Sequence, residues 1–338
     1  MFLSLRRREV GAGAARGRSS ATNNATVLAN NGAPFSPLRL TRTVRAAGAF
    51  ARRLELEAVH DWHDGCVNTI SFTEGGDQLI SGSDDEKIVI GRWETGEVTL
   101  QYESGHTNNV FQAKTMPHSG EKNIASCAAD GQVRMGEIQE GGKVETRQLA
   151  KHRGRAHKLA VDPLSPHLLL STGEDGKVLE IDTRAPPQAV TELVRVTRTN
   201  GRVVALNCIS LSPASSNLFC VGGGDSFCRV FDRRMTVSGD HESTRVREVA
   251  KLCPTHLREG PALRWGLSIT CTAYSSTGAE ILASYNDELI YEFSADCGAT
   301  PQAAPKAAGG LLFSLPPPRN TRGAEEGGSA GGGDGEGG

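Results

Sequence analysis

The sequence contains no run of about 18 apolar residues, so no transmembrane helix is expected. Its net charge of −2 argues against a general nucleic-acid binder, which needs a basic surface. The eight cysteines are scattered without a Cys-x-x-Cys pair, and a reducing compartment is the simplest interpretation. There is no Gly-x-Ser-x-Gly, no Walker loop and no His-Glu-x-x-His, so the sequence predicts neither an enzyme nor a cofactor.

One pattern occurs five times along the chain. It consists of an apolar run, a cluster of turn-forming residues and a second apolar run. In its first copy Leu79–Ser81 precede the turn residues Gly82–Asp85, and the β-branched run Ile88–Ile90 follows. Two short apolar runs separated by turn formers predict a β-hairpin. The other copies span residues 124–135, 169–181, 219–231 and 281–293.

The turn aspartates define the period of this repeat. They are Asp85, Asp130, Asp175, Asp225 and Asp287, at intervals of 45, 45, 50 and 62 residues. A period near 45 residues built of short strands is typical of β-propeller blades. A first strand is expected before each hairpin, at residues 65–72, 109–114, 156–161, 206–211 and 269–274. The predicted fold class is all-β, a propeller with about five visible blades.

A histidine lies 22 to 24 residues before each of the first three turn aspartates. The pairs are His63 and Asp85, His106 and Asp130, and His152 and Asp175. A buried carboxylate needs a hydrogen-bond partner, so we interpret the pairs as structural ties. A metal site is the alternative interpretation for His63, because the possible ligands His60, Asp64 and Cys66 lie near it in the sequence. This alternative is weaker. No second ligand pair follows them at zinc-site spacing, so the sequence predicts no metal.

Two blade ends share the form apolar-Asp-x-Arg. They are Ile181–Arg184 and Phe231–Arg234, and in both the arginine falls nine residues after the turn aspartate. An arginine just past the third strand of a blade is expected at the rim, where its guanidinium can form paired hydrogen bonds to a partner. The alternative is an arginine that pairs only with its own aspartate or with solvent. The occurrence of the box in consecutive blades favours an interface.

Several segments carry a family resemblance, in order, over roughly residues 60–293. Besides the two boxes they are Gly65–Thr69, Ser81–Asp85, Ser104–His106, Asn109–Lys114, Ala129–Arg134, His157–Ala160, Gly173–Asp175, Cys253–Pro254 with His256–Leu257, and Ala283–Glu288. On these segments the chain resembles the WD40-repeat cullin-4-associated factors, the substrate receptors of cullin-RING ubiquitin ligases. Within that family the resemblance is closer to the eighth-numbered factor and its plant relatives.

The resemblance implies a non-catalytic protein that docks on the damaged-DNA-binding-protein adaptor of a cullin-4 ligase and presents an unknown protein substrate. Arg184 and Arg234, oriented by Asp182 and Asp232, would contact the adaptor. The resemblance also implies a nuclear or cytoplasmic location, without direct nucleic-acid or membrane partners. The alternatives are a generic WD40 scaffold without a ligase link and a non-functional truncated product.

The family has seven blades, whereas the repeat pattern here stops after five. An incomplete ring would expose the flank of its first blade around Val67–Phe72 and the flank of its fifth blade around Leu282–Phe293. Such bared apolar flanks favour self-association or aggregation.

The segments outside the repeats differ in composition. Residues 1–46 predict a disordered basic arm, since residues 1–53 hold ten arginines and one acidic residue; an organellar transit peptide is the alternative. A partial apolar stripe predicts a lead-in helix over residues 47–59. Residues 60–294 form the predicted repeat domain, and residues 295–338 predict a disordered tail rich in Gly, Ala and Pro.

Overall fold

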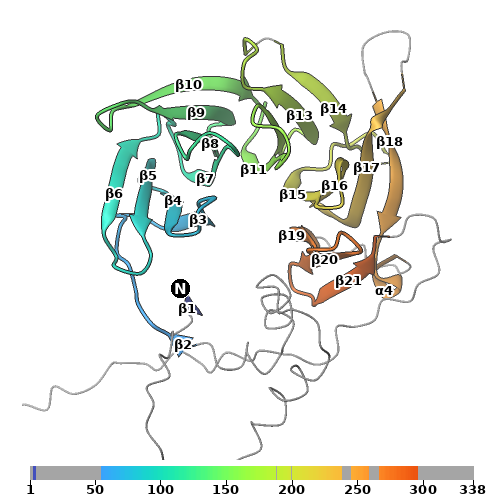
Figure 1. Cartoon of the computed structure of the whole chain (residues 1–338). Helices are drawn as coiled ribbons and strands as arrows, with labels where there is room; N and C mark the ends of the chain where they lie inside the picture. The colour runs from blue at the N-terminus through green and yellow to red at the C-terminus, as the bar shows by residue number, and fades with distance from the viewer. Residues whose placement is uncertain are drawn as a thin grey trace, which may run out of the picture.

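The computed structural model describes residues 3–4, 55–187, 189–198, 200–237, 245–258 and 266–295. Five antiparallel sheets follow one another around an arc, and each is one blade of a β-propeller (Figure 1). The first strand of each blade lies on the inside of the arc, and the fourth strand, where present, lies on the outside. Among the described residues, no helix is long and apolar enough to cross a membrane.

The blades are sequential meanders, with four strands in each of blades one to four and three strands in blade five. Blade one contains β3 (Val67–Phe72), β4 (Gln78–Ser83), β5 (Lys87–Arg92) and β6 (Val98–Glu103). Blade two contains β7 (Val110–Thr115), β8 (Asn123–Ala128), β9 (Gln132–Ile138) and β10 (Val144–Lys151). Blade three contains β11 (Ala156–Val161), β12 (Leu168–Gly173), β13 (Lys177–Asp182) and β14 (Thr191–Arg195). Blade four contains β15 (Leu206–Ser212), β16 (Ser215–Gly223), β17 (Asp225–Val237) and β18 (Arg245–Leu252). Blade five contains β19 (Ile269–Tyr274), β20 (Glu280–Tyr285) and β21 (Ile290–Ser294), preceded by the short helix α4 (Thr255–Arg258).

All five predicted hairpins and all five predicted first strands are confirmed. The hairpins are β4–β5, β8–β9, β12–β13, β16–β17 and β20–β21. In blades one to four the second strand is apolar or small without alternation because neighbouring structure covers both faces, as the five consecutive buried residues Ile124–Ala128 of β8 show. The predicted all-β propeller class is therefore observed.

The apolar core lies between the blades. Four clusters of buried side chains each join two consecutive blades. The first unites Ile80, Ile88 and Ile90 of blade one with Val110 and Ile124 of blade two. The remaining three repeat this arrangement between blades two and three, three and four, and four and five. Each blade is therefore stabilised mainly by the burial of its flanks against its neighbours.

The predicted lead-in helix is wrong where the structure describes it. Residues 55–56 form the short strand β2 (Glu55–Leu56), paired with β1 (Leu3–Ser4), and residues 57–60 belong to neither a helix nor a strand. Two side chains bind this segment to the turn that follows β5 in blade one. The His60 ring nitrogen Nε2 lies 2.9 Å from the Trp93 carbonyl oxygen. The Trp62 indole N–H donates to the Gly96 carbonyl oxygen at 3.1 Å. These long-range bonds outweigh a weak local helix preference.

The same segment explains an unusual blade ending, Gly91-Arg92. A Cβ atom built on Gly91 would lie only 2.7 Å from the Trp62 ring. The absence of a side chain at Gly91 therefore lets the Trp62 ring lie against blade one. The predicted basic arm over residues 1–46, apart from the backbone of β1, and the predicted tail beyond Ala295 lie outside the described residues.

The first blade has an apolar flank that its counterparts bury. Val67 is 51% exposed, whereas the residues at the same register in the other four blades, Val110, Ala156, Leu206 and Ile269, are fully buried. Ile70 and Phe72 point to the same side and are 47% and 61% exposed. In the other blades this side of the first strand is packed against the preceding blade.

The fifth blade shows the complementary exposure on its opposite side. Leu282 is 43% exposed, although the matching residues of blades one to four, Ile80, Ala125, Leu170 and Cys220, are buried. Ile290 is 57% exposed, whereas its counterparts Ile88, Val133 and Val178 are buried. The two flanks named from the sequence are therefore both uncovered in this arc.

These uncovered flanks lead to a prediction about solution behaviour. We expect the full chain to self-associate at micromolar concentration, because burying apolar surface contributes about 25 cal/mol per Å². The double substitution Ile70→Lys/Ile290→Lys should shift the population towards monomer in size-exclusion chromatography with light scattering. The matched control is Leu164→Lys, at an exposed turn residue away from both flanks. A monodisperse monomer of the unmodified chain would contradict the prediction.

Candidate functional site

The three predicted histidine–aspartate pairs are all formed. The His63 Nδ1 atom lies 2.9 Å from an Asp85 carboxylate oxygen, and the matching distance between His152 and Asp175 is also 2.9 Å. In blade two, the His106 Nδ1 atom lies 3.2 Å from both oxygens of Asp130. Each contact ties the loop that enters a blade to the hairpin turn of that blade.

Each tie contains a serine that the sequence interpretation missed. The Nε2 atoms of the three histidines lie 2.8–2.9 Å from the hydroxyls of Ser81, Ser126 and Ser171. Each serine stands four residues before its turn aspartate, so a regular spacing was present as a signal. The complete unit is therefore an Asp-His-Ser chain of hydrogen bonds, repeated in blades one to three.

An Asp-His-Ser chain has the composition of a hydrolase triad, but its surroundings favour a structural role. The serines Ser81, Ser126 and Ser171 and the rings of the three histidines are buried. A nucleophilic hydroxyl must reach a substrate next to oxyanion-stabilising donors, and these hydroxyls lie inside the blades. The repetition of the same chain in three blades also matches a scaffold.

The carboxylates of the ties are held in their ionised form. Burial would raise the pKa of Asp130, but hydrogen bonds from His106 and from the Gln132 and Thr107 backbone N–H groups outweigh burial and lower that pKa below its usual value. Asp85 and Asp175 have the same balance, with burial opposing the hydrogen bonds from their histidines and neighbouring backbone, and their pKa values are also lowered. The ties are therefore charge-assisted hydrogen bonds at neutral pH.

Blades four and five depart from this pattern. Asp225 pairs instead with the buried Arg229, whose guanidinium nitrogens lie 2.9 and 2.5 Å from its two carboxylate oxygens. Asp287 lies at the equivalent register, but its side chain is exposed and its φ is 58°. His60, a candidate metal ligand, bonds the Trp93 carbonyl oxygen. Within the part of the chain that the structure describes, no three metal-binding side chains gather at one point.

The two Asp-x-Arg boxes have the same geometry. Arg184 donates through Nε and Nη2 to the two Asp182 oxygens at 3.0 and 2.7 Å, and its backbone N–H donates to Asp182 at 2.9 Å. Arg234 contacts Asp232 at 3.0 and 2.6 Å, with a backbone contact of 2.9 Å. The arginine side chains remain 67% and 68% exposed. Each aspartate therefore orients an arginine whose other donors face solvent.

The fork contacts change the ionisation of the box carboxylates in the expected direction. The hydrogen bonds from Arg184 lower the pKa of Asp182 to about 2. The side-chain hydrogen bond from Arg234 likewise lowers the pKa of Asp232. Both carboxylates are ionised at neutral pH, so the two boxes present matched, oriented guanidinium groups.

The middle residues of the boxes connect neighbouring blades. Arg233 of blade four donates to the Glu180 carboxylate of blade three at 2.8 and 2.5 Å, and it also lies 3.6 Å from Asp162. Thr183, in the first box, accepts a hydrogen bond of 2.7 Å through its carbonyl from Arg147 of blade two. These contacts join the two boxes to the framework on both sides. The sequence interpretation did not assign a role to either Arg233 or Arg147, because an arginine does not recur at the equivalent positions of the other blades.

Comparisons with known proteins add a family context. A protein-family model described as "WD domain, G-beta repeat" matches residues 55–90. Among solved structures, the β-propeller domain of Cps50 (Swd1) from Myceliophteria thermophila aligns with a TM-score of 0.54 and 19% sequence identity, covering 69% of this chain and 66% of that domain. This likeness shows the fold alone.

Curated relatives are more similar in sequence. Human DDB1- and CUL4-associated factor 6 is 33% identical over 262 residues, which are 76% of this chain and 30% of that protein. Protein ALTERED SEED GERMINATION 2 of Arabidopsis thaliana is 30% identical over 279 residues, covering 74% of this chain and 37% of that protein. Human WD and tetratricopeptide repeats protein 1 is 32% identical over 200 residues, covering 59% of this chain and 29% of that protein. The chain thus spans about a third of the length of these relatives.

Replacing a tie histidine should lower stability without affecting any chemistry. His106→Ala leaves the Asp130 carboxylate and the Ser126 hydroxyl without their buried partner, at a cost of about 1–3 kcal/mol in the free energy of unfolding. Thermal and urea unfolding measure this loss. The control is His118→Ala, at an exposed histidine 3.9 Å from Glu74. If His106→Ala unfolds like the unmodified chain and removes a hydrolytic activity, the structural interpretation is wrong.

The lowered pKa of Asp130 leads to a prediction for acid. A carboxyl whose pKa is lower in the folded state stabilises the fold above its unfolded value of 3.8, and this contribution is lost as the pH falls through the folded value. Asp130→Asn should therefore be less stable than the unmodified chain at pH 7, and the difference should narrow below about pH 4. Urea unfolding between these pH values measures it, with the exposed Asp61→Asn as control. If the difference in unfolding free energy between Asp130→Asn and the unmodified chain is the same at both pH values, the lowered pKa of Asp130 is refuted.

Proposed function

From the premise that the chain is a WD40-repeat protein related to the DDB1- and CUL4-associated factors, we propose that it is the receptor portion of a cullin-4 RING ubiquitin ligase. It docks on the adaptor DDB1 and presents a protein substrate, and ubiquitin transfer belongs to other subunits. The predicted resemblance to WD40 cullin-4-associated factors is confirmed. The narrower resemblance to the eighth-numbered factor stays a prediction.

One observation carries the proposal: two consecutive blades end in identical, solvent-facing Asp–Arg forks. An exposed arginine loses side-chain entropy when a partner binds it, and a fork already oriented by Asp182 or Asp232 loses less. Arg233 and Arg147 hold the boxes to adjacent blades, so the two forks form one rigid docking edge. This arrangement supports Arg184 and Arg234 as the adaptor contacts.

The third strand of each box-bearing blade sets the distance between its Asp–Arg fork and the opposite edge of that blade. In blade three, β13 runs from the turn at Asp175 to the box at Asp182. Six extended residues span about 20 Å. A protein bound to the boxes therefore leaves the edge that carries the histidine–aspartate ties open for a second protein. This two-edged geometry suits a receptor that bridges an adaptor and a substrate.

The alternative is a WD40 scaffold with no ligase link. The boxes by themselves are compatible with it, because each arginine also neutralises its own aspartate. The two readings differ in whether purified DDB1 binds the chain directly through the forks. A nuclear or cytoplasmic location is part of the ligase proposal.

The adaptor contact is tested by removing the forks. Arg184→Ala/Arg234→Ala should weaken capture of purified DDB1 at least about tenfold, because truncation of interface arginines is among the most costly changes at protein interfaces. The variant should stay folded with at most a small fall in melting temperature, since both arginine side chains are exposed and exposed ion pairs contribute little to stability. Arg184→Lys/Arg234→Lys should also bind weakly, because lysine cannot form the fork.

The matched control is Arg153→Ala, which removes an exposed arginine from the opposite edge of blade three. It should leave adaptor capture intact. Undiminished capture by the double alanine variant would reject the proposed contact. Absence of binding by the unmodified chain would favour the scaffold alternative.

A further inference from the structure

The edge opposite the boxes carries a set of basic residues concentrated on blade three. Two adjoining hollows, of about 740 and 320 Å³, lie along this edge. Their lining includes five cationic side chains, Lys151, Arg153, Arg155, Lys177 and Arg195, and three carboxylates, Asp130, Glu174 and Asp175. We refer to these five cationic residues as the basic edge. Arg198 and Arg202, in the loop that follows β14, add further positive charge nearby.

Most of the carboxylates on this edge are already engaged. Asp130 and Asp175 accept hydrogen bonds from the tie histidines and from backbone N–H groups. Glu192, on the neighbouring β14, contacts Lys177 at 2.6 Å and Arg195 at 2.8 Å. The edge therefore has more cations than carboxylates available to neutralise them.

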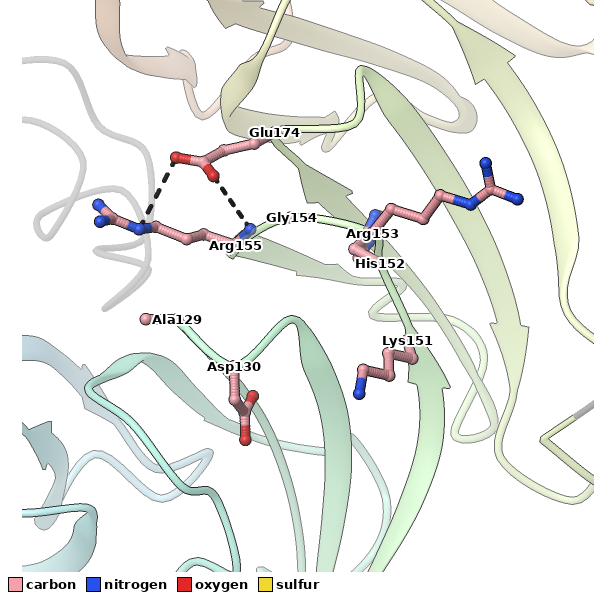
Figure 2. Close-up of a pocket in the computed structure, with 8 residues that line it drawn as sticks. All are labelled: Ala129, Asp130, Lys151, His152, Arg153, Gly154, Arg155 and Glu174. Carbon is pink, nitrogen blue, oxygen red and sulfur yellow. Dashed lines mark hydrogen bonds and ion pairs between the residues drawn. The ribbon is translucent and has the colours of Figure 1, made fainter.

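Two cationic groups remain without a carboxylate. Figure 2 shows Arg155 turned towards Glu174, which lies 3.9 Å from its Nε atom, whereas the Arg153 side chain extends to the opposite side. Among the described residues, neither the Arg153 guanidinium nor the Lys151 ammonium group lies within 4 Å of a carboxylate oxygen. Both border the hollow and are exposed to solvent, so both are available to a ligand.

The repeat itself shows that the fold does not require these charges. The position after the tie histidine is Asp64 in blade one, Thr107 in blade two and Arg153 in blade three. In all three blades the backbone N–H of this residue donates to the turn aspartate, so the side chain is free to vary. Two residues further on, the blades have Cys66, Asn109 and Arg155. The basic residues of blade three are therefore additional to the needs of the scaffold.

The inside of the arc next to blade three also carries positive charge. Lys114 on β7 and Lys158 on β11 belong to the innermost strands of blades two and three (Figure 1). Burial, and then the repulsion of Lys158, lower the pKa of Lys114. No ion pair to either lysine is formed within the described ranges. The innermost strands of blades two and three thus carry two lysines without a described carboxylate partner, which adds to the positive charge of this part of the molecule.

We propose that the basic edge of blade three, with Arg153 and Lys151 as its free cations, binds a carboxylate-rich segment of a protein partner. A peptide fits better than a nucleic acid, because blade one, which lies beyond blade two, presents Asp64, Asp84 and Glu86 on the same edge and would repel a polyphosphate chain long enough to reach it. The inference rests on the proposed function, in which this edge faces the substrate, and names acidic segments as the substrate chemistry. The carboxylates of the peptide would pair with Arg153 and Lys151, in contacts weakened by salt.

The test uses the full chain and a fluorescein-labelled poly-glutamate peptide in fluorescence anisotropy, without the adaptor. The variant Arg153→Thr/Arg155→Asn installs the residues that blade two already has at these positions, so its fold should be retained. It should weaken peptide binding about tenfold or more. The control Arg92→Thr/Lys143→Asn removes the same charge from the other end of the blades and should bind as the unmodified chain does.

Three results would overturn the inference: no binding at low salt, an equal loss in both variants, or displacement of the peptide by single-stranded DNA of the same charge at lower concentration. Binding of a phosphoserine peptide in place of poly-glutamate would overturn the assignment of carboxylates. Adaptor capture is measured separately through Arg184 and Arg234. A failure of the basic edge is thereby distinguishable from a failure of the proposed ligase role.

Discussion

The packing of one blade against the next is the constraint on which the rest of this structure depends. A single blade is a thin sheet with two apolar flanks, and it buries them only when neighbours are present on both sides. The four apolar clusters each join two consecutive blades, and most of the core lies in them. The exposed Val67 and Leu282 show the same rule at the two ends of the arc, where no further blade is described. Stability is therefore a sum of nearest-neighbour contacts, as in other repeat proteins.

The hydrogen-bonded ties act within this framework by fixing loops to turns. Each buried Asp-His-Ser chain uses the histidine ring to satisfy a carboxylate and a hydroxyl at once. In blade three the residue after the tie histidine, Arg153, contributes only its backbone N–H to the tie, so its side chain is not needed for the fold. The rim boxes follow similar logic, since Asp182 and Asp232 fix backbone and guanidinium together. Rigid turns thus carry side chains that are free to contact partners.

Much of this site was predictable because its residues recur at fixed intervals. In the repeat of about 45 residues, the tie histidines lie 22 to 24 residues before their turn aspartates and the box arginines nine residues after theirs. The structure forms the contacts within the ties and boxes. Ser81, Ser126 and Ser171 followed the same period and were missed only because serine is common in turns and strands. Arg229 and Arg233 were hidden for a different reason. Each replaces or supplements a repeat contact in one blade alone, so no interval marks it.

The sequence by itself determined the first three strands of each blade, their order and the pairing of the hairpins, because hairpins are local and their signals lie within about twenty residues. The fourth strands β6, β10, β14 and β18 were not predicted. The sequence also determined the histidine–aspartate pairs of the ties, since the two residues lie 22 to 24 positions apart in each of the three blades, although it did not identify their serines. Only the tertiary structure decided which apolar residues are covered, because the coverage of Val67 or Leu282 depends on a neighbouring blade and not on the residue itself. It likewise decided that residues 55–60 are not helical, since the side chains of His60 and Trp62 bond carbonyl groups more than thirty residues away. The tertiary structure also aligned the loop residues of blades one to three position by position, and this alignment shows that the positive charge of blade three is not required by the fold.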